Sequence, residues 1–272
     1  MHPVLVRFDT PEFLRGIFPE TITLYSYGFM ILIGVLFAFW HTWYRRKEFN
    51  LDADQISDIF LWCFIGVFVG GKVFFYFEDP GRYLANPALM FKGLGSGFVF
   101  YGSFLVTIPV LIWRFKKKNI PVLPMFDVVA ISGALVHGFG KLGCFMSGCC
   151  HGIECHNPLG ITFTHPESNA EPLNIPLYPT QLMDAAMILG IVLLMLYLYP
   201  RKKFHGQLIL LYALIYGVGR TITEVYRGDE ARGYIIDGIL THSQFIAIFI
   251  LASSAYLWRK WSKSQRVKAE SN

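Results

Sequence analysis

Apolar residues along the chain gather into seven stretches that are long enough to cross a lipid bilayer. A helix needs about 20 mostly apolar residues to span a hydrocarbon core of about 30 Å, and a helix satisfies its backbone polar groups internally. The predicted spans are residues 21–44, 57–77, 96–113, 122–139, 180–199, 206–226 and 242–258. The pattern predicts an all-α, polytopic membrane protein that forms a single domain over residues 1–272.

Basic residues follow the odd-numbered stretches. The clusters are Arg45-Arg46-Lys47, Arg114 with Lys116-Lys117-Lys118, Arg201-Lys202-Lys203, and Arg259, Lys260, Lys263 and Arg266. Because short cytoplasmic loops carry an excess of Lys and Arg, this spacing predicts an N-terminus outside and a C-terminus in the cytoplasm. The loops at 79–95, 140–179 and 227–241 are then expected to be extracytoplasmic.

Composition supports a membrane protein and excludes other classes. Hydrophobic residues make up 54% of the chain and charged residues 16%, below the roughly 25% charged residues of a soluble domain. The net charge of +5 comes from the clusters that set the topology, so the expected partner is the lipid bilayer and not nucleic acid. Residues 1–20 lack the unbroken apolar core of a cleavable signal peptide, so the first apolar stretch is expected to be retained.

Unusual polar residues fall in the predicted outer half of the spans. A charged side chain at the centre of a spanning helix costs about 2.5–3.5 kcal/mol, so such groups usually face a cavity or a partner. Their convergence predicts a polar pocket near the outer leaflet. The residues are Tyr25, Tyr27, Lys72, Tyr101, His137, Lys141, Gln181, Arg220, Glu224, Arg227, His242 and Gln244.

The segment YGVGRTITEVYRG is the sharpest local signal. Arg220, Glu224 and Arg227 are spaced i, i+4 and i+7, which puts them on one helical face. Two guanidinium groups beside a carboxylate can hold a phosphate, with the carboxylate orienting one of them. The alternative is an Arg–Glu pair that only anchors the helix at the interface.

The segment GVFVGGK carries a lysine and two glycines four residues apart. Lys72 is either a further phosphate contact or a lysine that extends to the lipid headgroups. Gly66 and Gly70 are expected to let two helices approach closely.

Cysteines are concentrated in HGFGKLGCFMSGCCHGIECH. This segment holds Cys144, Cys149, Cys150 and Cys155, with His137, His151 and His156 nearby. On an oxidising side of the membrane the thiols can form disulfides, and thiols with imidazoles can also bind a soft metal. The spacing lacks the C-x2-C pair of a zinc site, which favours a disulfide-braced loop, and neither a metal nor a cofactor is predicted. Cys63 is expected to act as a small apolar residue.

These motifs, in this order, resemble the bacterial prolipoprotein diacylglyceryl transferase family. The resemblance runs through SYGFMILIG, GVFVGGK, GFVFYGS, GKLGCFMSG, YPTQL and YGVGRTITEVYR. It implies transfer of a diacylglyceryl group from phosphatidylglycerol to the lipobox cysteine in the signal peptide of a prolipoprotein, in the bacterial inner membrane, with release of glycerol 1-phosphate. It also matches Arg220, Glu224 and Arg227 to the family's Arg/Glu/Arg motif, Tyr27 to its tyrosine and Gly152 to the glycine closing its signature.

The resemblance breaks at four positions. The family usually has Arg, Asn, Glu and His where this chain has Lys141, Cys144, Cys149 and Tyr101. Displacement at a glycerol carbon needs a thiolate, so a base must take the thiol proton and cations must stabilise the leaving phosphate. We expect His137 or His151 to be the base, with Tyr27 and Glu224 also catalytic. The expected substrate-binding residues are Arg220, Arg227, Lys141, Lys72, Tyr101, Gln181 and Gly152.

Two other classes of function remain open on the sequence. In the first, the Cys/His cluster is the active element of a thiol redox or metal-handling membrane protein. The second is a transporter, for which the sequence offers neither an inverted repeat nor polar groups at the membrane midplane. The transferase is the leading prediction.

Overall fold

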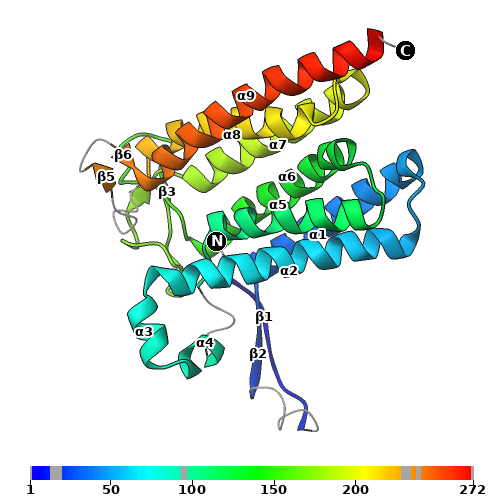
Figure 1. Ribbon diagram of the computed structural model, residues 1–272. Coiled ribbons are helices and arrows are strands. Elements are labelled where there is room, and N and C mark those ends of the chain that lie inside the picture. Colours follow the sequence, from blue (N-terminus) through cyan, green and yellow to red (C-terminus); the bar gives the residue numbers. More distant parts are fainter. Residues whose placement is uncertain (1, 13–19, 93–96, 228–233, 237–239, 271–272) are drawn as a thin grey trace. The chain divides into compact units, whose positions relative to one another are not determined.

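The computed structural model describes the backbone of residues 2–12, 20–92, 97–227, 234–236 and 240–270, and most of these residues are helical (Figure 1). The chain divides into two compact units, Met1–His41 with Phe126–Asn272 and Thr42–Met125. Among the described residues, five helical stretches are long and apolar enough to cross a membrane: Ser26–Phe49, Ala53–Glu78, Val122–Ser147, Thr180–Arg201 and Gln207–Val225. The prediction of a helical, polytopic membrane protein is confirmed.

All seven predicted spans coincide with helices. These are α1 (Ser26–Arg45), α2 (Ala53–Glu78), α5 (Phe100–Lys117), α6 (Val122–Ser147), α7 (Thr180–Leu198), α8 (Gln207–Val225) and α9 (His242–Glu270). α5 and α9 are not among the five apolar stretches. The last turn of α5 carries Arg114, Lys116 and Lys117, and α9 continues beyond Trp258 into a strongly basic segment. Their assignment as spans stays a prediction.

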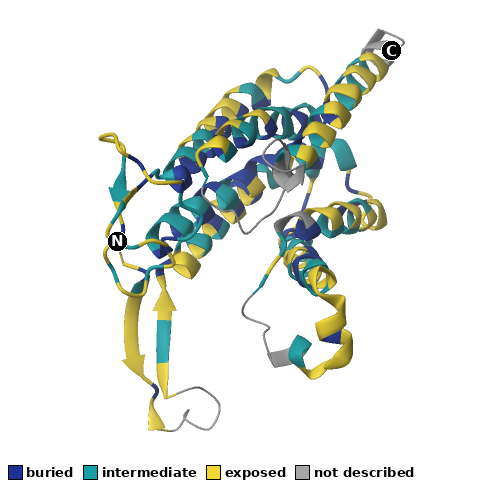
Figure 2. Ribbon diagram, turned by 90° about the vertical axis from the view of Figure 1, so that its left-hand side faces the viewer, coloured by how far each residue is buried: buried dark blue, intermediate teal, exposed yellow. Residues whose placement is uncertain are grey.

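Several predicted boundaries are wrong: the third span, predicted as residues 96–113, is helical over Phe100–Lys117. Thr21–Tyr25 is not helical but forms strand β2, which pairs antiparallel with β1 (Val4–Asp9); the β-branched and aromatic residues of this segment favour a strand. Most residues of this hairpin are exposed (Figure 2).

The fourth span runs on to Ser147, so the loop predicted to start at residue 140 starts at 148. The helix continues through its glycines because their missing side chains admit close neighbours. A Cβ on Gly138 would lie 2.9 Å from Leu189, one on Gly140 3.1 Å from Ile31, and one on Gly143 3.1 Å from Tyr27.

The unit Thr42–Met125 is built on α2 and α5, with the short helices α3 (Pro80–Ala85) and α4 (Ala88–Lys92) between them. A Cβ on Gly66 would lie 2.8 Å from Thr107, and one on Gly70 2.4 Å from the Gly102 carbonyl oxygen. The glycines therefore bring two helices into backbone contact, as predicted. Near the other end of this pair, Arg114 donates a bidentate hydrogen bond to Asp58.

The other unit packs α1 on α6, α7 on α8 and α8 on α9 (Figure 1). A Cβ on Gly34 of α1 would lie 2.9 Å from Val136 of α6, and His41 hydrogen-bonds Ser132 at 3.0 Å. The fully buried Asp127 fixes the start of α8, because its carboxylate accepts from the backbone N–H of Leu208 at 2.8 Å and from Lys202 at 2.9 Å.

Residues 148–179 connect α6 to α7 and are folded around a small core of their own. β3 (Ile161–Thr162) pairs with β4 (Pro176–Leu177), and Phe163, Ala170 and Leu177 are buried beneath them. A last hairpin, β5 (Tyr234–Ile236) with β6 (Leu240–Thr241), precedes α9. The connecting segment therefore has a fixed conformation where it meets the helix ends.

Candidate active site

The ends of three helices meet around the turn that follows α6. The side chains of Thr180 and Gln181, at the start of α7, donate to the carbonyl oxygens of Cys150 and Cys149, each at 2.8 Å. Both side chains are fully buried. Gly152 bridges antiparallel to Arg227, just beyond the end of α8. Buried hydrogen bonds thus hold the turn between α7 and α8.

Gly152 is where this contact is tightest. A Cβ at this position would lie 2.3 Å from the Tyr226 carbonyl oxygen and 2.6 Å from the Tyr178 Cβ. The Gly152 N–H donates to the Tyr178 carbonyl at 2.8 Å, and the Ile153 N–H to that of Tyr226 at 2.9 Å. A side chain at residue 152 would push these backbones apart. This close packing requires glycine at position 152, and the predicted substrate-binding role of Gly152 stays a prediction.

Two buried ion pairs lie in the same region. Nζ of Lys141 donates to Asp184 at 2.7 Å, and Nη2 of Arg220 lies 2.5 Å from the Glu224 carboxylate. The Asp184 side chain is fully buried, and those of Arg220 and Glu224 are 7% and 9% exposed. Asp184 also interacts electrostatically with Arg220, which joins the two pairs into one network. Burying an unpaired charge at this position would cost a large amount of free energy. Each of these buried charges is therefore paired with one of opposite sign.

The network has a surplus of positive charge. The two ion pairs are neutral together, and Arg227, whose positive charge acts on the neighbouring Cys150, adds a third cation to the two carboxylates of Asp184 and Glu224. Within the described part of the chain, Nη1 of Arg220 is buried and has no hydrogen-bond partner. A buried guanidinium with an unused donor favours an anion with several acceptor oxygens. The arrangement suits a phosphodiester, which carries a single negative charge.

Three of the four clustered cysteines come together beside this network. The Sγ atoms of Cys144, Cys149 and Cys150 all lie within 4.8 Å of one another, and none of the three is in a disulfide. Hydrogen bonds with the other two thiols and the positive charges of Arg227 and Lys141 lower the pKa of Cys150, against the effect of burial. Cys155 is a buried free thiol that contacts Asn157 at 3.1 Å. The expected disulfide brace is therefore not what the structure contains.

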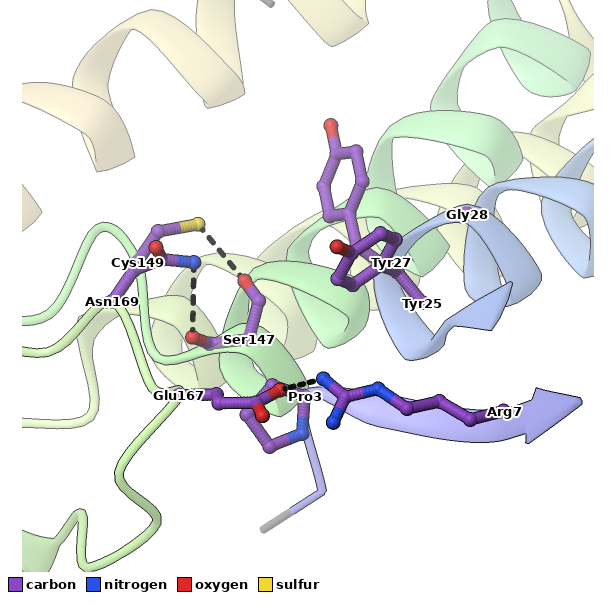
Figure 3. Close-up of a pocket in the computed structure, with 9 residues that line it drawn as sticks. All are labelled: Pro3, Arg7, Tyr25, Tyr27, Gly28, Ser147, Cys149, Glu167 and Asn169. Carbon is purple, nitrogen blue, oxygen red and sulfur yellow. Dashed lines mark hydrogen bonds and ion pairs between the residues drawn. The ribbon is translucent and has the colours of Figure 1, made fainter. Parts of the chain in front are cut away.

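A pocket of about 740 Å³ opens next to the cysteines (Figure 3). Tyr27, at the start of α1, lines it together with Cys149, and Tyr27 interacts electrostatically with all three clustered thiols. The exposed ion pair between Arg7 and Glu167, at 2.5 Å, lies in its wall. The remaining residues of the lining are Pro3, Tyr25, Gly28, Ser147 and Asn169.

The two histidines expected as bases have different surroundings. His151 uses both ring nitrogens for the backbone: Nδ1 donates to the Gly152 carbonyl at 2.9 Å, and Nε2 accepts from the Glu171 N–H at 3.2 Å. These bonds argue against a proton-transfer role for His151. Nδ1 of His137 lies 2.6 Å from the Tyr212 hydroxyl, and the ring interacts with Lys141, Asp184 and Arg220.

Three further predicted polar residues are Lys72, Tyr101 and His242. Lys72 lies in the unit Thr42–Met125, is 4% exposed, and has its ammonium group 4.7 Å from the centre of the Phe98 ring. The side chains of Tyr101 and His242 lie outside the described residues. The predicted phosphate contact of Lys72 and the predicted role of Tyr101 stay predictions.

Asp184 is the site residue that the sequence interpretation missed. It follows Gln181 by three residues, so both occupy one face at the start of α7. The available signal was an acidic residue inside an otherwise apolar span, because such a residue requires a partner. Lys141 is that partner, and it lies on a different helix.

Comparison with known proteins identifies relatives along nearly the whole chain. The family model for prolipoprotein diacylglyceryl transferase matches residues 16–259. The phosphatidylglycerol–prolipoprotein diacylglyceryl transferase of Clostridium tetani is 36% identical over 237 residues, which cover 87% of this chain and 93% of that protein. A second enzyme of that name, from Clostridium perfringens, is 32% identical over 87% of this chain and 91% of its own length. One from Pseudomonas entomophila is 30% identical over 91% of this chain and 93% of its own length.

Proposed function

Because the chain belongs to the prolipoprotein diacylglyceryl transferase family, we propose that the network around Arg220 and the neighbouring thiols is the site of that family's reaction. Its activity is the transfer of a diacylglyceryl group from phosphatidylglycerol to a prolipoprotein. The acceptor is the thiol of the lipobox cysteine in the signal peptide, and the leaving group is glycerol 1-phosphate.

The observation that carries this proposal is the buried, unpartnered Nη1 of Arg220 within a network of net positive charge. The phosphodiester of the donor lipid carries one negative charge, and a second develops on its phosphate as the carbon–oxygen bond breaks. Fixed cations in a water-poor site stabilise that growing charge more than they stabilise the ground state. Glu224 orients Arg220, and Asp184 orients Lys141.

The acceptor thiol must lose its proton before it attacks. His137 is our candidate for the general base, because an imidazole can accept a proton, the Asp184 carboxylate acts on this ring, and Nδ1 lies 2.6 Å from the Tyr212 hydroxyl. Tyr27 lies beside the pocket and the thiols, so its hydroxyl is suited to orient a substrate oxygen or sulfur. Gln181 and Gly152 act indirectly, since they hold the turn that carries the cysteines.

The topology of the site is consistent with helices that cross the membrane in alternating directions. In one unit, the start of α1, the end of α6, the start of α7 and the end of α8 all contribute to the site. Alternate crossing directions bring these four ends to the same side of the membrane, and this is the outer side if α1 begins outside, as the basic clusters predict. We therefore propose that all seven helices span the bacterial inner membrane and that the site faces the outer leaflet, where the signal peptide is exported.

Complementation tests the proposed function. A bacterium depleted of its own diacylglyceryl transferase is supplied with this chain, and the N-terminal peptide of a lipoprotein is analysed by mass spectrometry. The expected result is growth together with a diacylglyceryl-modified cysteine. Absence of the modified peptide, despite protein correctly inserted in the membrane, contradicts the proposal.

A further inference from the structure

The three clustered thiols form a group that the network of charged residues does not explain. The Sγ atoms of Cys144, Cys149 and Cys150 lie within 4.8 Å of one another. In this family the positions of Cys144 and Cys149 usually carry an amide and a carboxylate. Three thiols this close together, beside the pocket of the candidate active site, could form a disulfide or bind a metal ion.

The backbone around the thiols is fixed before any ligand binds. Cys144 lies in the last turns of α6, whereas Cys149 and Cys150 follow in the turn held by Gln181 and Thr180. Cys150 has a positive φ of 61°, a left-handed conformation that non-glycine residues seldom adopt. The turn thus directs thiols from a helix and a loop toward one point.

A disulfide accounts for this group less well than a metal ion does. Consecutive Cα atoms lie about 3.8 Å apart, whereas disulfide-bonded residues usually have Cα atoms about 4.4–6.8 Å apart, so a bond between Cys149 and Cys150 is strained. Any other pairing leaves one of the three thiols without a partner. A single thiophilic ion uses all three.

We propose that Cys144, Cys149 and Cys150 bind one thiophilic divalent ion of the zinc class, with a fourth coordination position that receives the lipobox thiol of the substrate. The inference rests on the proposed function and deepens it by assigning how the nucleophile is activated.

The geometry fits such an ion. With zinc–sulfur bonds of about 2.3 Å and tetrahedral angles, two thiolates on one ion lie about 3.8 Å apart. The Sγ atoms, which all lie within 4.8 Å of one another, reach this spacing by approaching one another by up to about 1 Å. Catalytic zinc sites use three protein ligands and keep one position open, whereas structural sites use four. Among the described residues, the ligand group has these three members.

The surrounding charges fit as well. Three thiolates and one divalent ion sum to a charge of −1, and this becomes −2 when a substrate thiolate binds. Lys141 and Arg227 are the cations that act on Cys150. They offset part of this charge, as groups around a bound metal commonly tune its chemistry.

The open side of the cluster is accessible. Cys149 lines the pocket shown in Figure 3, together with Tyr27 and Ser147. The Ser147 hydroxyl donates to the Cys149 sulfur at 3.2 Å, and the Asn169 side chain donates to the Ser147 carbonyl at 3.3 Å. Cys149 is therefore the member of the cluster that a peptide in the pocket would meet.

The reaction balances without any redox change. The substrate thiol ionises when it coordinates the ion, because a coordinated thiol is deprotonated, and the proposed base His137 takes the proton. Its sulfur attacks the glycerol carbon that carries the phosphate, so a C–S bond forms and the C–O bond breaks. The electron pair leaves with the phosphate oxygen, and the released proton ends on glycerol 1-phosphate. The ion keeps its oxidation state throughout.

The test uses the full-length protein, purified in detergent, with Zn²⁺ measured by mass spectrometry and Co²⁺ as an optical probe. The wild type is expected to bind about one Zn²⁺ per chain and to show sulfur-to-cobalt charge-transfer bands. The controls Cys63→Ser and Cys155→Ser should behave in the same way. Cys150→Ser should retain less than about a tenth of the metal. A lipobox peptide should change the cobalt spectrum, and its Cys→Ser analogue should not.

Cys144→Asn with Cys149→Glu is the second variant, because it introduces the residue types usual in the family. It should insert in the membrane and show neither zinc nor cobalt bands. A wild type that binds no Zn²⁺ or Co²⁺, or one that transfers diacylglyceryl groups equally well after chelation, overturns the metal site and leaves the proposed function intact. A protein that binds the metal but never modifies the peptide contradicts the proposed function instead.

Discussion

Lys141 of α6 donates a hydrogen bond of 2.7 Å to Asp184 of α7, whose side chain is fully buried. The two residues are 43 positions apart in the chain. Their pairing ties together the helices on either side of the cysteine turn, and it joins the neighbouring Arg220–Glu224 pair in a network beside which Arg227 supplies one excess positive charge. The Lys141–Asp184 ion pair therefore contributes both to the stability of the fold and to the balance of charges in the candidate active site.

Removing one partner of this pair should destabilise the protein strongly. Lys141→Met leaves the Asp184 carboxylate buried without its cation, which typically costs about 3–5 kcal/mol. Lys141→Met combined with Asp184→Asn removes both charges and should recover a large part of this loss. The measurement is the unfolding transition in detergent. Arg7→Gln, which removes an exposed ion pair with Glu167, is the matched control and should leave the transition unchanged. Equal stability of wild type and Lys141→Met would contradict the assignment.

Gly152→Ala should disrupt the contact between the cysteine turn and the end of α8. The added methyl group would lie 2.3 Å from the Tyr226 carbonyl oxygen, and overpacking of this kind costs about 1–3 kcal/mol. Transfer activity should fall because the turn and Arg227 move apart. Gly133→Ala is the control, because a Cβ there meets no atom within 4 Å. The idea fails if both variants have the same activity and unfolding temperature.

Tyr27→Phe should slow the reaction, whereas Tyr25→Phe should not. Both tyrosines line the pocket of Figure 3, but among the described contacts it is Tyr27 that interacts with the three thiols. Loss of a hydrogen bond to a charged group costs about 1.5–3 kcal/mol, or about 10- to 100-fold in rate. The measurement is the rate at which each variant modifies a lipobox peptide in phosphatidylglycerol vesicles. Equal rates for the two variants would remove Tyr27 from the site.

The two histidines should respond differently to replacement by Gln. His137→Gln should lower the rate of transfer per folded molecule, since the proposed base is lost. His151→Gln should instead lower the unfolding temperature, because both ring nitrogens of His151 bond the backbone. Rates normalised to folded protein separate these effects. A His137→Gln variant with wild-type turnover would require another base.

Local sequence patterns predicted the helices well because each span is an independent apolar run. They failed where contacts between segments far apart in the sequence determine where a helix ends or whether a strand forms. The glycines of α6 suggested an end near Phe139, yet the helix continues since Leu189, Ile31 and Tyr27 occupy the space that the glycine side chains leave. Thr21–Tyr25 was placed in a membrane span, but this apolar segment pairs with β1.

The site was predicted in part for the same reason. Arg220 and Glu224 lie one turn apart on one helix, so their spacing in the sequence was sufficient to predict the pair. Lys141 and Asp184 come from different helices, and no local pattern joins them. The cysteine spacing suggested disulfides, whereas the left-handed turn at Cys150 brings three free thiols together.

The central claim is that the Arg220 network binds and stabilises the phosphate of the lipid donor. The most direct measurement is the rate at which purified protein in phosphatidylglycerol vesicles modifies a lipobox peptide, followed by mass spectrometry of the peptide and by release of glycerol 1-phosphate. Arg220→Gln should lower this rate by about 10²- to 10³-fold at saturating lipid, as expected when one donor to a developing negative charge is removed. Arg201→Gln, at the opposite end of α7, where the guanidinium bonds the Tyr197 carbonyl, should keep the wild-type rate. A folded Arg220→Gln protein that releases glycerol 1-phosphate as fast as the wild type would contradict the account.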